Sequence, residues 1–144
     1  MTTIKYKIES MDVIEEHVTP GNYTDDGTMK THNQVGFSMI IKKCTLLCSH
    51  RVILSKNGLS FLDILFETTF SITSDCVEEM KTNGKLEVPK GFLIQCGSLS
   101  YGTLRGVVLM IAKKEGLDNI IMPPAYINEL ITEPLVIDLE DSKQ

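Results

Sequence analysis

The stretch that decides the fold is GFLIQCGSLSYGTLRGVVLMIAKKEG, residues 91–116. Its apolar residues have helical spacing but fall around most of the helix circumference, as Leu99, Leu104 and Met110 illustrate. A helix of this kind needs two covers, because apolar surface left in water forgoes roughly 25 cal/mol per Å² of burial. One cover can come from the chain's own sheet. We therefore predict that the other comes from a second layer or another copy, and oligomerisation is the simplest solution.

Small residues recur at every fourth position of this helix, at Ser98, Gly102 and Gly106. They form a shallow groove that lets another backbone approach closely. The alternative is that the glycines only allow tight packing on the chain's own sheet. The predicted oligomer interface consists of Ser98, Leu99, Gly102, Gly106 and Met110.

The helix is expected to begin near Pro89 and to end at Lys113-Lys114-Glu115-Gly116, where cations suit the helix dipole and glycine suits a left-handed cap. Pro123-Pro124 then imposes an extended stretch before a short helix over residues 125–131. Polar residues, above all Arg105, exclude a membrane span in the long helix. The opening MTTIKYKIES has no secretory signal pattern, so we expect a cytoplasmic protein.

Composition indicates one globular domain with a substantial core: 144 residues, 42% hydrophobic and 23% charged. A net charge of −5 argues against a nucleic-acid partner. The four cysteines are too few for a disulfide scaffold. Cys44, Cys48 and His50 could share a strand face as metal ligands, but the spacing lacks paired knuckles, and we favour thiols that fill core volume and no metal.

Period-2 alternation predicts four strands and an antiparallel sheet. In the first strand, from Ile4 to Val13, the alternation changes phase at Ser10, which predicts a bulge there. Residues 19–33 are expected to be a long crossover loop. The other strands are expected at residues 35–41, 46–54 and 59–72, with a tight hairpin at Asn57-Gly58 and a connector over residues 73–88. We assign residues 1–134 to a single domain and residues 135–144 to an acidic tail.

Three short matches occur in order along this architecture: Phe70-Ser71-Ile72 at the end of the last strand, Leu104-Arg105 in the long helix, and Ile121-Met122-Pro123 followed by Tyr126. With them, the sequence from about Tyr6 to Leu130 resembles the SecB family of protein-export chaperones. The resemblance implies an α+β protomer in which a long helix and a short C-terminal helix cover a four-stranded antiparallel sheet. It also implies a homotetramer built as a dimer of dimers, and cofactor-free, ATP-independent holding of unfolded preproteins for the translocation ATPase SecA.

The resemblance also implies site residues. Client segments would bind apolar grooves lined by the crossover loop, the second strand and the short helix, and the matching residues are Tyr23, Met29, Phe37, Met39, Tyr126, Ile127 and Leu130. SecA would contact an exposed sheet face through Asp12 and Glu16 of the first strand and Phe61 and Asp63 of the last. The alternatives are core packing for the first set and a solvated strand face for the second.

Other functions stay open. A charged connector before the long helix and the double proline depart from the family pattern, which leaves room for another client, such as an antitoxin. We expect no enzyme, because the sequence has no GxSxG, phosphate-loop, HExxH or nucleotide motif, and His17, His32 and His50 have no telling partners. A structural or adaptor oligomer would use the same helix without binding clients.

Overall fold

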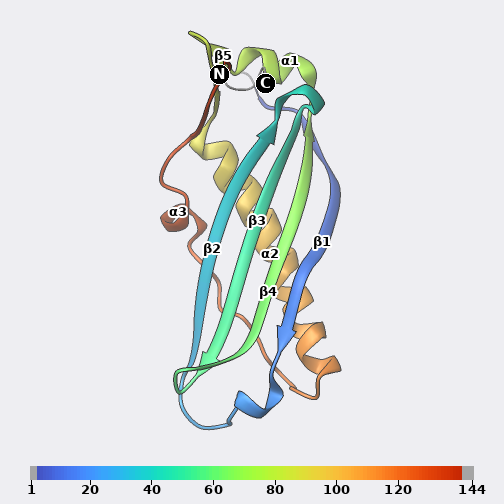
Figure 1. Ribbon diagram of the computed structural model, residues 1–144, viewed down its shortest axis with the longest axis vertical. Coiled ribbons are helices and arrows are strands. Elements are labelled where there is room, and N and C mark those ends of the chain that lie inside the picture. The colour runs from blue at the N-terminus through green and yellow to red at the C-terminus, as the bar shows by residue number, and fades with distance from the viewer. Residues whose placement is uncertain (1–2, 141–144) are drawn as a thin grey trace.

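The computed structural model describes residues 3–140, and its frame is a four-stranded antiparallel sheet with one long helix packed across one face (Figure 1). The strands are β1 (Tyr6–Val18), β2 (Met29–Ile40), β3 (Thr45–Lys56) and β4 (Leu59–Ile72), in the order β1-β4-β3-β2. The long helix is α2 (Lys90–Lys114), and α3 (Ile127–Leu130) is the short one. The predicted α+β fold class is confirmed.

The hairpin between β3 and β4 confirms the turn chemistry of Asn57-Gly58. Both residues have positive φ, 51° and 79°, as a two-residue type I′ hairpin turn requires. Lys56 and Leu59 pair across the turn, and the two strands stay paired as far as Thr45 and Ser71. A register shift lies between Leu54 and Ser55, so the turn residues and this bulge together set the register of the two central strands.

Strand β1 contains two bulges. The register shift between Ile8 and Ser10 confirms the predicted bulge, and a second shift lies between Val13 and Glu15. Each shift moves the following side chains to the other face of the sheet. The second bulge was not predicted, and it changes which acidic residues of β1 share a face.

Strand β2 begins at Met29, so the prediction of a loop as far as residue 33 was wrong. The crossover is shorter and contains the 3₁₀ turn η1 (Pro20–Asn22). Polar residues at Lys30, His32 and Gln34 point to solvent, as they can on an edge strand, and this gives the segment the composition of a loop. A second 3₁₀ turn, η2 (Ile41–Lys43), makes the break expected at the lysine pair.

A small second sheet was not predicted. After helix α1 (Ser74–Glu79), strands β5 (Lys81–Thr82), β6 (Lys85–Val88) and β7 (Leu135–Asp138) pair in that order. Strand β7 lies at the start of the segment that the sequence assigned to an acidic tail, and it is antiparallel to β6. The last four residues of that segment, 141–144, lie outside the described residues. The pairing brings the C-terminal part of the chain back to the element that precedes α2 (Figure 1).

Helix α2 ends as predicted. Gly116 has φ +82°, its N–H donates to the carbonyl of Lys113 at 3.0 Å, and the N–H of Leu117 donates to that of Ala112 at 2.9 Å. These two bonds form a Schellman cap, which satisfies carbonyls at the end of the helix. At the other end, Pro89 is the N-cap.

One flank of α2 is buried against the sheet, and it includes Leu93, Cys96, Leu104 and Val108. The opposite flank is uncovered in the single chain. None of the helices within residues 3–140 is both long and apolar enough to cross a membrane.

The stretch after α2 is held by two side chains of that helix. The Tyr101 hydroxyl donates to the carbonyl of Pro123 at 2.6 Å, and Arg105 Nε donates to that of Met122 at 3.1 Å. Because prolines cannot form regular main-chain ladders, these side-chain bonds fix the path of the extended stretch. They direct the chain back along the sheet to α3.

Candidate functional site

A groove of about 210 Å³ lies between the edge of the main sheet and the stretch that follows α3. Its walls are Val35, Gly36 and Phe37 of β2, Leu93 of α2, and residues 130–135. Glu133 is the only charged residue among them. A groove whose lining residues are mostly apolar suits apolar side chains better than a polar metabolite.

The groove brings together two of the predicted client-binding residues, Phe37 and Leu130. A third, Ile127, is buried beneath it, where its Cγ2 would lie 3.0 Å from a Cβ added at Gly97. The missing side chain of Gly97 therefore lets α3 sit directly on α2. This close contact fixes the position of the far wall of the groove.

The other predicted client residues are divided between two regions. Met39 lies on the same face of β2 as Phe37, and Tyr126, at the start of α3, is 72% exposed. Tyr23 and Met29 are at the other end of the sheet. At about 3.3 Å per residue, Met29 lies about 26 Å from Phe37 along β2. The predicted set therefore contains a groove group and a distant pair.

The distant pair has a structural environment of its own. The Tyr23 ring meets Phe61 edge to face, with ring centroids 5.0 Å apart, and Lys56 Nζ lies 5.2 Å from the centre of the Tyr23 ring. Lys56 also donates to the carbonyls of Asp26 and Gly27. Tyr23 thus anchors the crossover to the sheet.

Sequence reasoning missed most of the residues that line the groove. Val35 could have been found from the alternation of β2, because it shares the face of Phe37. Leu93, Ile131 and Leu135 could not, since their positions depend on the packing of α3 on α2 and on the pairing of β7 with β6.

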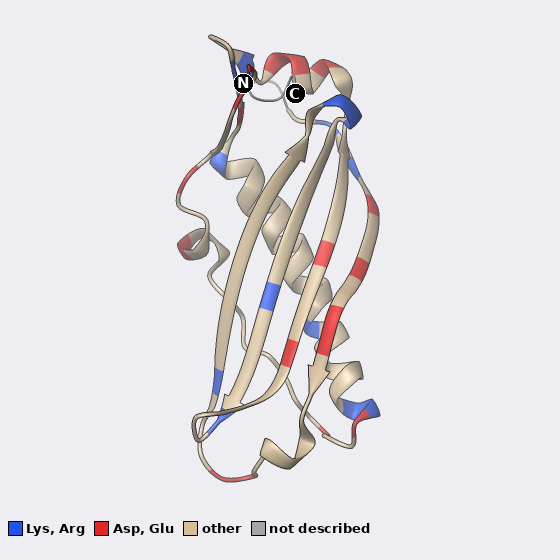
Figure 2. Ribbon diagram, viewed as in Figure 1, with Lys and Arg blue, Asp and Glu red and all other residues tan. Residues whose placement is uncertain are grey.

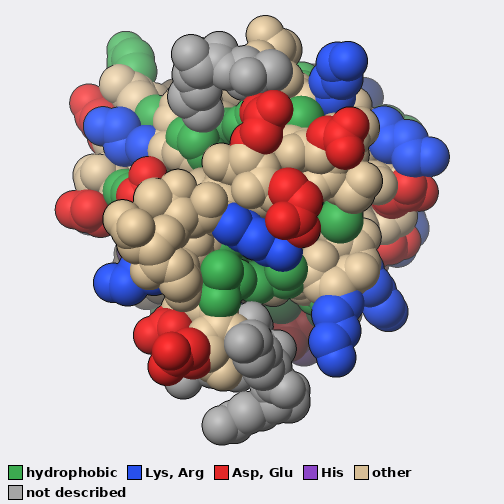
Figure 3. Space-filling view, turned by 90° about the horizontal axis from the view of Figure 1, so that it is seen from above, with side chains coloured by type: hydrophobic (Ala, Val, Ile, Leu, Met, Phe, Trp, Pro, Cys, Tyr) green, Lys and Arg blue, Asp and Glu red, His purple; other side chains and the backbone are tan. Residues whose placement is uncertain are grey.

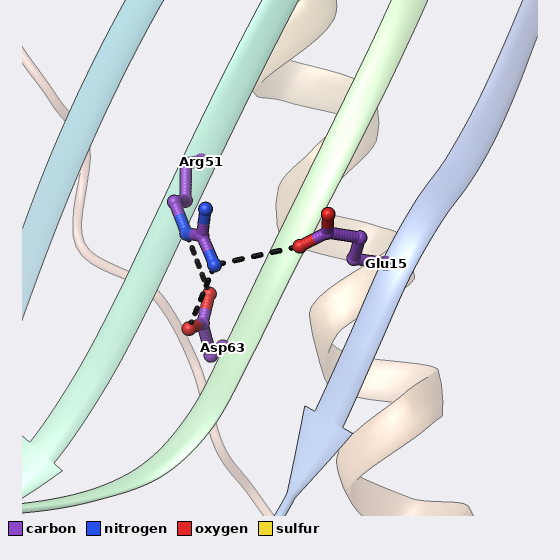
Figure 4. Close-up of polar contacts among 3 residues, drawn as sticks. All are labelled: Glu15, Arg51 and Asp63. Atoms are coloured by element: carbon purple, nitrogen blue, oxygen red, sulfur yellow. Dashed lines mark hydrogen bonds and ion pairs between the residues drawn. The ribbon is translucent and has the colours of Figure 1, made fainter.

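Within residues 3–140, no helix covers the face of the sheet away from α2, and the charged residues of strands β1 and β4 are mainly acidic (Figure 2). Asp12 pairs directly with Glu67 across β1 and β4. On the same face, Arg51 forms a fork with Asp63, at 3.0 and 3.1 Å, and reaches Glu15 at 3.5 Å (Figure 4). Hydrogen bonding by Asp63 raises the pKa of Arg51. This open acidic face contains two of the predicted partner residues, Asp12 and Asp63.

The other two predicted partner residues lie elsewhere. Glu16 pairs with Ile64 on the helix-covered face, and its carboxylate is 3.4 Å from Lys114 Nζ of α2. The bulge at Val13/Glu15 explains this, since residues four apart in a regular strand would share a face. Phe61 is only 1% exposed and fills the space under Tyr23. Neither side chain belongs to the open acidic face.

The predicted oligomer interface lies along the uncovered flank of α2. Leu99 is 41% and Met110 64% exposed, and a Cβ added at Gly102 or Gly106 would meet nothing within 4 Å. The alternative that these two glycines serve tight packing on the chain's own sheet is therefore wrong. The Ser98 hydroxyl donates to a carbonyl of its own helix, so this polar group on the flank already has a hydrogen-bond partner. Association through it stays a prediction.

Between α2 and the sheet lies a buried polar group. His50 Nε2 donates a 2.9 Å hydrogen bond to Asn33 Oδ1, and the His50 ring lies 5.2 Å from that of Tyr101. Burial lowers the pKa of His50 to about 4, so the ring is neutral near pH 7. Burial also raises the pKa values of Cys48 and Cys96 to about 12, which keeps both thiols protonated and suited to filling core volume.

A second and larger cavity, of about 1010 Å³, lies at the end of the molecule beside α1 and the small sheet. Seen from that end, apolar side chains show between charged ones (Figure 3). Ile4, Met80 and Val136 contribute apolar surface to this cavity, and Lys85 and Glu87 contribute charge. None of the predicted client-binding or partner residues lines it.

Comparison with known proteins bears on the fold. No protein-family model matches the chain, and no curated protein matches it significantly. Among solved structures, the chain is similar to the SecB-like chaperone Rv1957 of Mycobacterium tuberculosis, in complex with a ChAD peptide from the HigA1 antitoxin Rv1956. The similarity covers 83% of this chain and 90% of that one, with a TM-score of 0.52 and 10% sequence identity. The chain therefore has a SecB-like fold.

Proposed function

We propose that the protein is an ATP-independent holding chaperone that binds unfolded polypeptide in the groove beside β2. The observation that carries this proposal is the combination of a SecB-like fold with an open apolar groove at Phe37 and Leu130. An unfolded chain exposes the apolar side chains that such a groove accepts. Because binding removes these side chains from water, capture requires neither chemistry nor a cofactor.

A single groove of this size gives weak binding, and several grooves on one assembly would bind a long chain with useful avidity. We therefore include self-association in the proposal. The uncovered flank of α2 supports it, since its small residues allow two helices to approach closely and Leu99 and Met110 supply apolar area. The specific assembly that we propose is a homotetramer built as a dimer of dimers.

Delivery of preproteins to SecA is a narrower form of the proposal. Its support is the open acidic face, where Asp12 lies directly beside Glu67. Neither of these carboxylates has an ion-pair partner within residues 3–140, so both are available to a basic surface. Asp63 contributes less, because Arg51 already pairs with it. Charge complementarity of this kind speeds and orients docking.

An antitoxin is a second candidate client. The structure that the chain resembles contains an antitoxin peptide bound to a SecB-like chaperone, which supports this alternative. Both candidates require the same groove and differ in the polypeptide that reaches it.

Light scattering tests the proposal. A chemically denatured substrate protein is diluted into buffer with and without this protein, in the absence of ATP, and we expect stoichiometric suppression of aggregation. Leu130→Asp places a charge in the groove and should weaken suppression. Ile14→Asp alters an exposed residue of the β1 bulge and serves as the matched control. Unchanged scattering with the wild-type protein would refute the chaperone proposal and favour a structural or adaptor oligomer.

A further inference from the structure

The stretch between α2 and α3 turns its double proline toward solvent (Figure 1). We call the run from Met122 to Ile127 the proline strap. The two residues at its ends are buried, whereas Pro123, Pro124 and Tyr126 are exposed, and Tyr126 has 72% of its surface open. The strap is therefore anchored at both ends and presents two prolines and a tyrosine between the anchors.

The conformation of the strap is fixed before any partner arrives. Arg105 holds the carbonyl of Met122, and the Tyr101 hydroxyl holds that of Pro123. The proline ring fixes φ at about −65°, and a residue that precedes proline is biased toward an extended or polyproline II conformation. No regular helix or strand begins in the strap before Ile127. Because the segment is already ordered, a partner that binds it loses little further backbone freedom.

The burial pattern of the strap has the period of a polyproline II helix. Such a helix has three residues per turn, so residues three apart share a side. Pro123 and Tyr126 are both exposed, and Met122 and Ala125 are buried and half-buried, respectively. One side of the strap thus packs on the protein, and another presents a proline and a tyrosine together.

Tyr126 differs from the other three tyrosines of the chain. The rings of Tyr6, Tyr23 and Tyr101 each lie against another aromatic ring, with centroids 5.0 to 5.9 Å apart. Within residues 3–140, the Tyr126 side chain has no ring contact and no hydrogen bond. Tyrosine joins an apolar ring to a polar tip and is enriched at protein interfaces. This side chain is therefore available to a partner.

Other modes of recognition do not fit the strap. Pro123 and Pro124 have no N–H group, so neither an added strand nor a second copy can pair with them in a continuous β-ladder. Neither proline lines the groove beside β2, and nor does Tyr126. No two of the five prolines in the sequence are three residues apart, so the PxxP pattern that SH3 domains bind is absent. The remaining pattern is Pro-Pro-Ala-Tyr.

We propose that the proline strap is a docking site for a protein module with an aromatic-lined polyproline groove and a pocket for tyrosine, the chemistry of a WW domain. The two prolines would pack on the aromatic groove, and Tyr126 would enter the pocket. Glu129 is exposed and is the only charged residue from Asn119 to Thr132, so a basic rim on the module would complement it. This surface is additional to the groove of the proposed function.

Binding of a purified WW domain tests the inference. The probe is a fluorescently labelled WW domain that selects Pro-Pro-x-Tyr ligands, and anisotropy measures its affinity for the full-length protein. Pro124→Ala and Tyr126→Ala should each weaken binding at least tenfold. Ile121→Ala is the matched control, because Ile121 is 64% exposed and lies just outside the strap, and it should bind like the wild-type protein. An SH3 domain that selects PxxP ligands should not bind.

Three outcomes would refute the docking site. The first is no binding of the WW domain to the wild-type protein, and the second is equal affinity for the wild-type protein and Tyr126→Ala. The third is affinity that falls as the protein concentration rises, because a second copy of the chain would then cover the strap.

The light-scattering assay separates this inference from the chaperone proposal. Pro124 lies outside the groove, so Pro124→Ala should lose WW-domain binding and still suppress aggregation like the wild-type protein. Loss of suppression in this variant would show that the strap serves client binding instead, and would overturn the inference.

Discussion

Replacing Gly97 with alanine tests how tightly α3 is held against α2, and thus the wall of the groove. The new Cβ would lie 2.9 Å from Ile131 Cδ1 and 3.0 Å from Ile127 Cγ2. Both distances are shorter than an ordinary van der Waals contact, and Ile127 is β-branched and buried, so it has little freedom to move. We expect α3 to shift away from α2 and the groove to change shape.

The matched control is Gly102→Ala in the same helix. Each substitution gains about 1 kcal/mol in helix propensity. Only Gly97→Ala also overpacks the core, at a cost of about 1–3 kcal/mol, because a Cβ at Gly102 meets nothing within 4 Å. The propensity gains cancel in the comparison. The Gly97 variant should therefore have the lower free energy of unfolding, by about 1–3 kcal/mol.

Urea denaturation of both variants, at one low protein concentration, measures this difference. Suppression of substrate aggregation should also be weaker in the Gly97 variant than in the control. If the Gly97 variant were as stable as the control, or more stable, α3 would not pack on α2 as the structure has it, and the assignment of the groove wall would be refuted.

Three further outcomes are expected. The folded-state pKa of His50 is about 4, below the unfolded value near 6.5, so its contribution to stability is complete above pH 6.5 and is lost as the pH falls through 4. The loss amounts to about 3 kcal/mol. Urea denaturation should show a smaller fall in the free energy of unfolding between pH 7 and pH 4 for His50→Phe than for the wild-type protein. An equal fall in the two proteins would contradict the lowered pKa of His50. Tyr101→Phe removes the hydrogen bond to the Pro123 carbonyl and should lower the free energy of unfolding by about 1–3 kcal/mol, whereas Tyr126→Phe, at an exposed position, should change it little. An equal effect of the two substitutions would contradict the stabilising role of the Tyr101 hydrogen bond. Gly106→Leu fills the small-residue groove of α2 and should reduce self-association in sedimentation experiments; an unchanged assembly would exclude this flank as the interface.

The parts of the fold that follow from short-range patterns were predictable. The alternation over residues 59–72 gave β4 with its bounds, because a strand buried on one face must alternate. Asn57-Gly58 gave the hairpin, since few other residues accept two successive positive φ values. Gly116 gave the helix cap for a similar reason.

The parts that depend on distant pairing were not predictable. Strand β7 is four residues long and forms only because β6, far away in the sequence, offers an edge. The bulge between Val13 and Glu15 leaves no clear mark on the sequence, yet it sends Glu16 to the opposite face from Asp12. One extra residue in a strand thus decided which acidic residues belong to the open acidic face.

The site divides in the same way. Phe37 and Leu130 were found because the architecture expected from the resemblance brings the second strand and the short helix together. Phe61 was misassigned because the bulge between β3 and β4 directs its side chain into the core. The local sequence, an apolar residue two positions before an acidic one, does not reveal this bulge. Leu135 was missed with the strand that positions it.

Site-specific photo-crosslinking tests most directly whether the groove holds unfolded polypeptide. A photoreactive residue is placed at Leu130, which is 39% exposed and lines the groove, or at Ile121, which is 64% exposed and lies outside it. Exposure alone would favour crosslinks at Ile121. We predict that a denatured substrate protein crosslinks mainly at Leu130, and equal or stronger crosslinking at Ile121 would contradict the account.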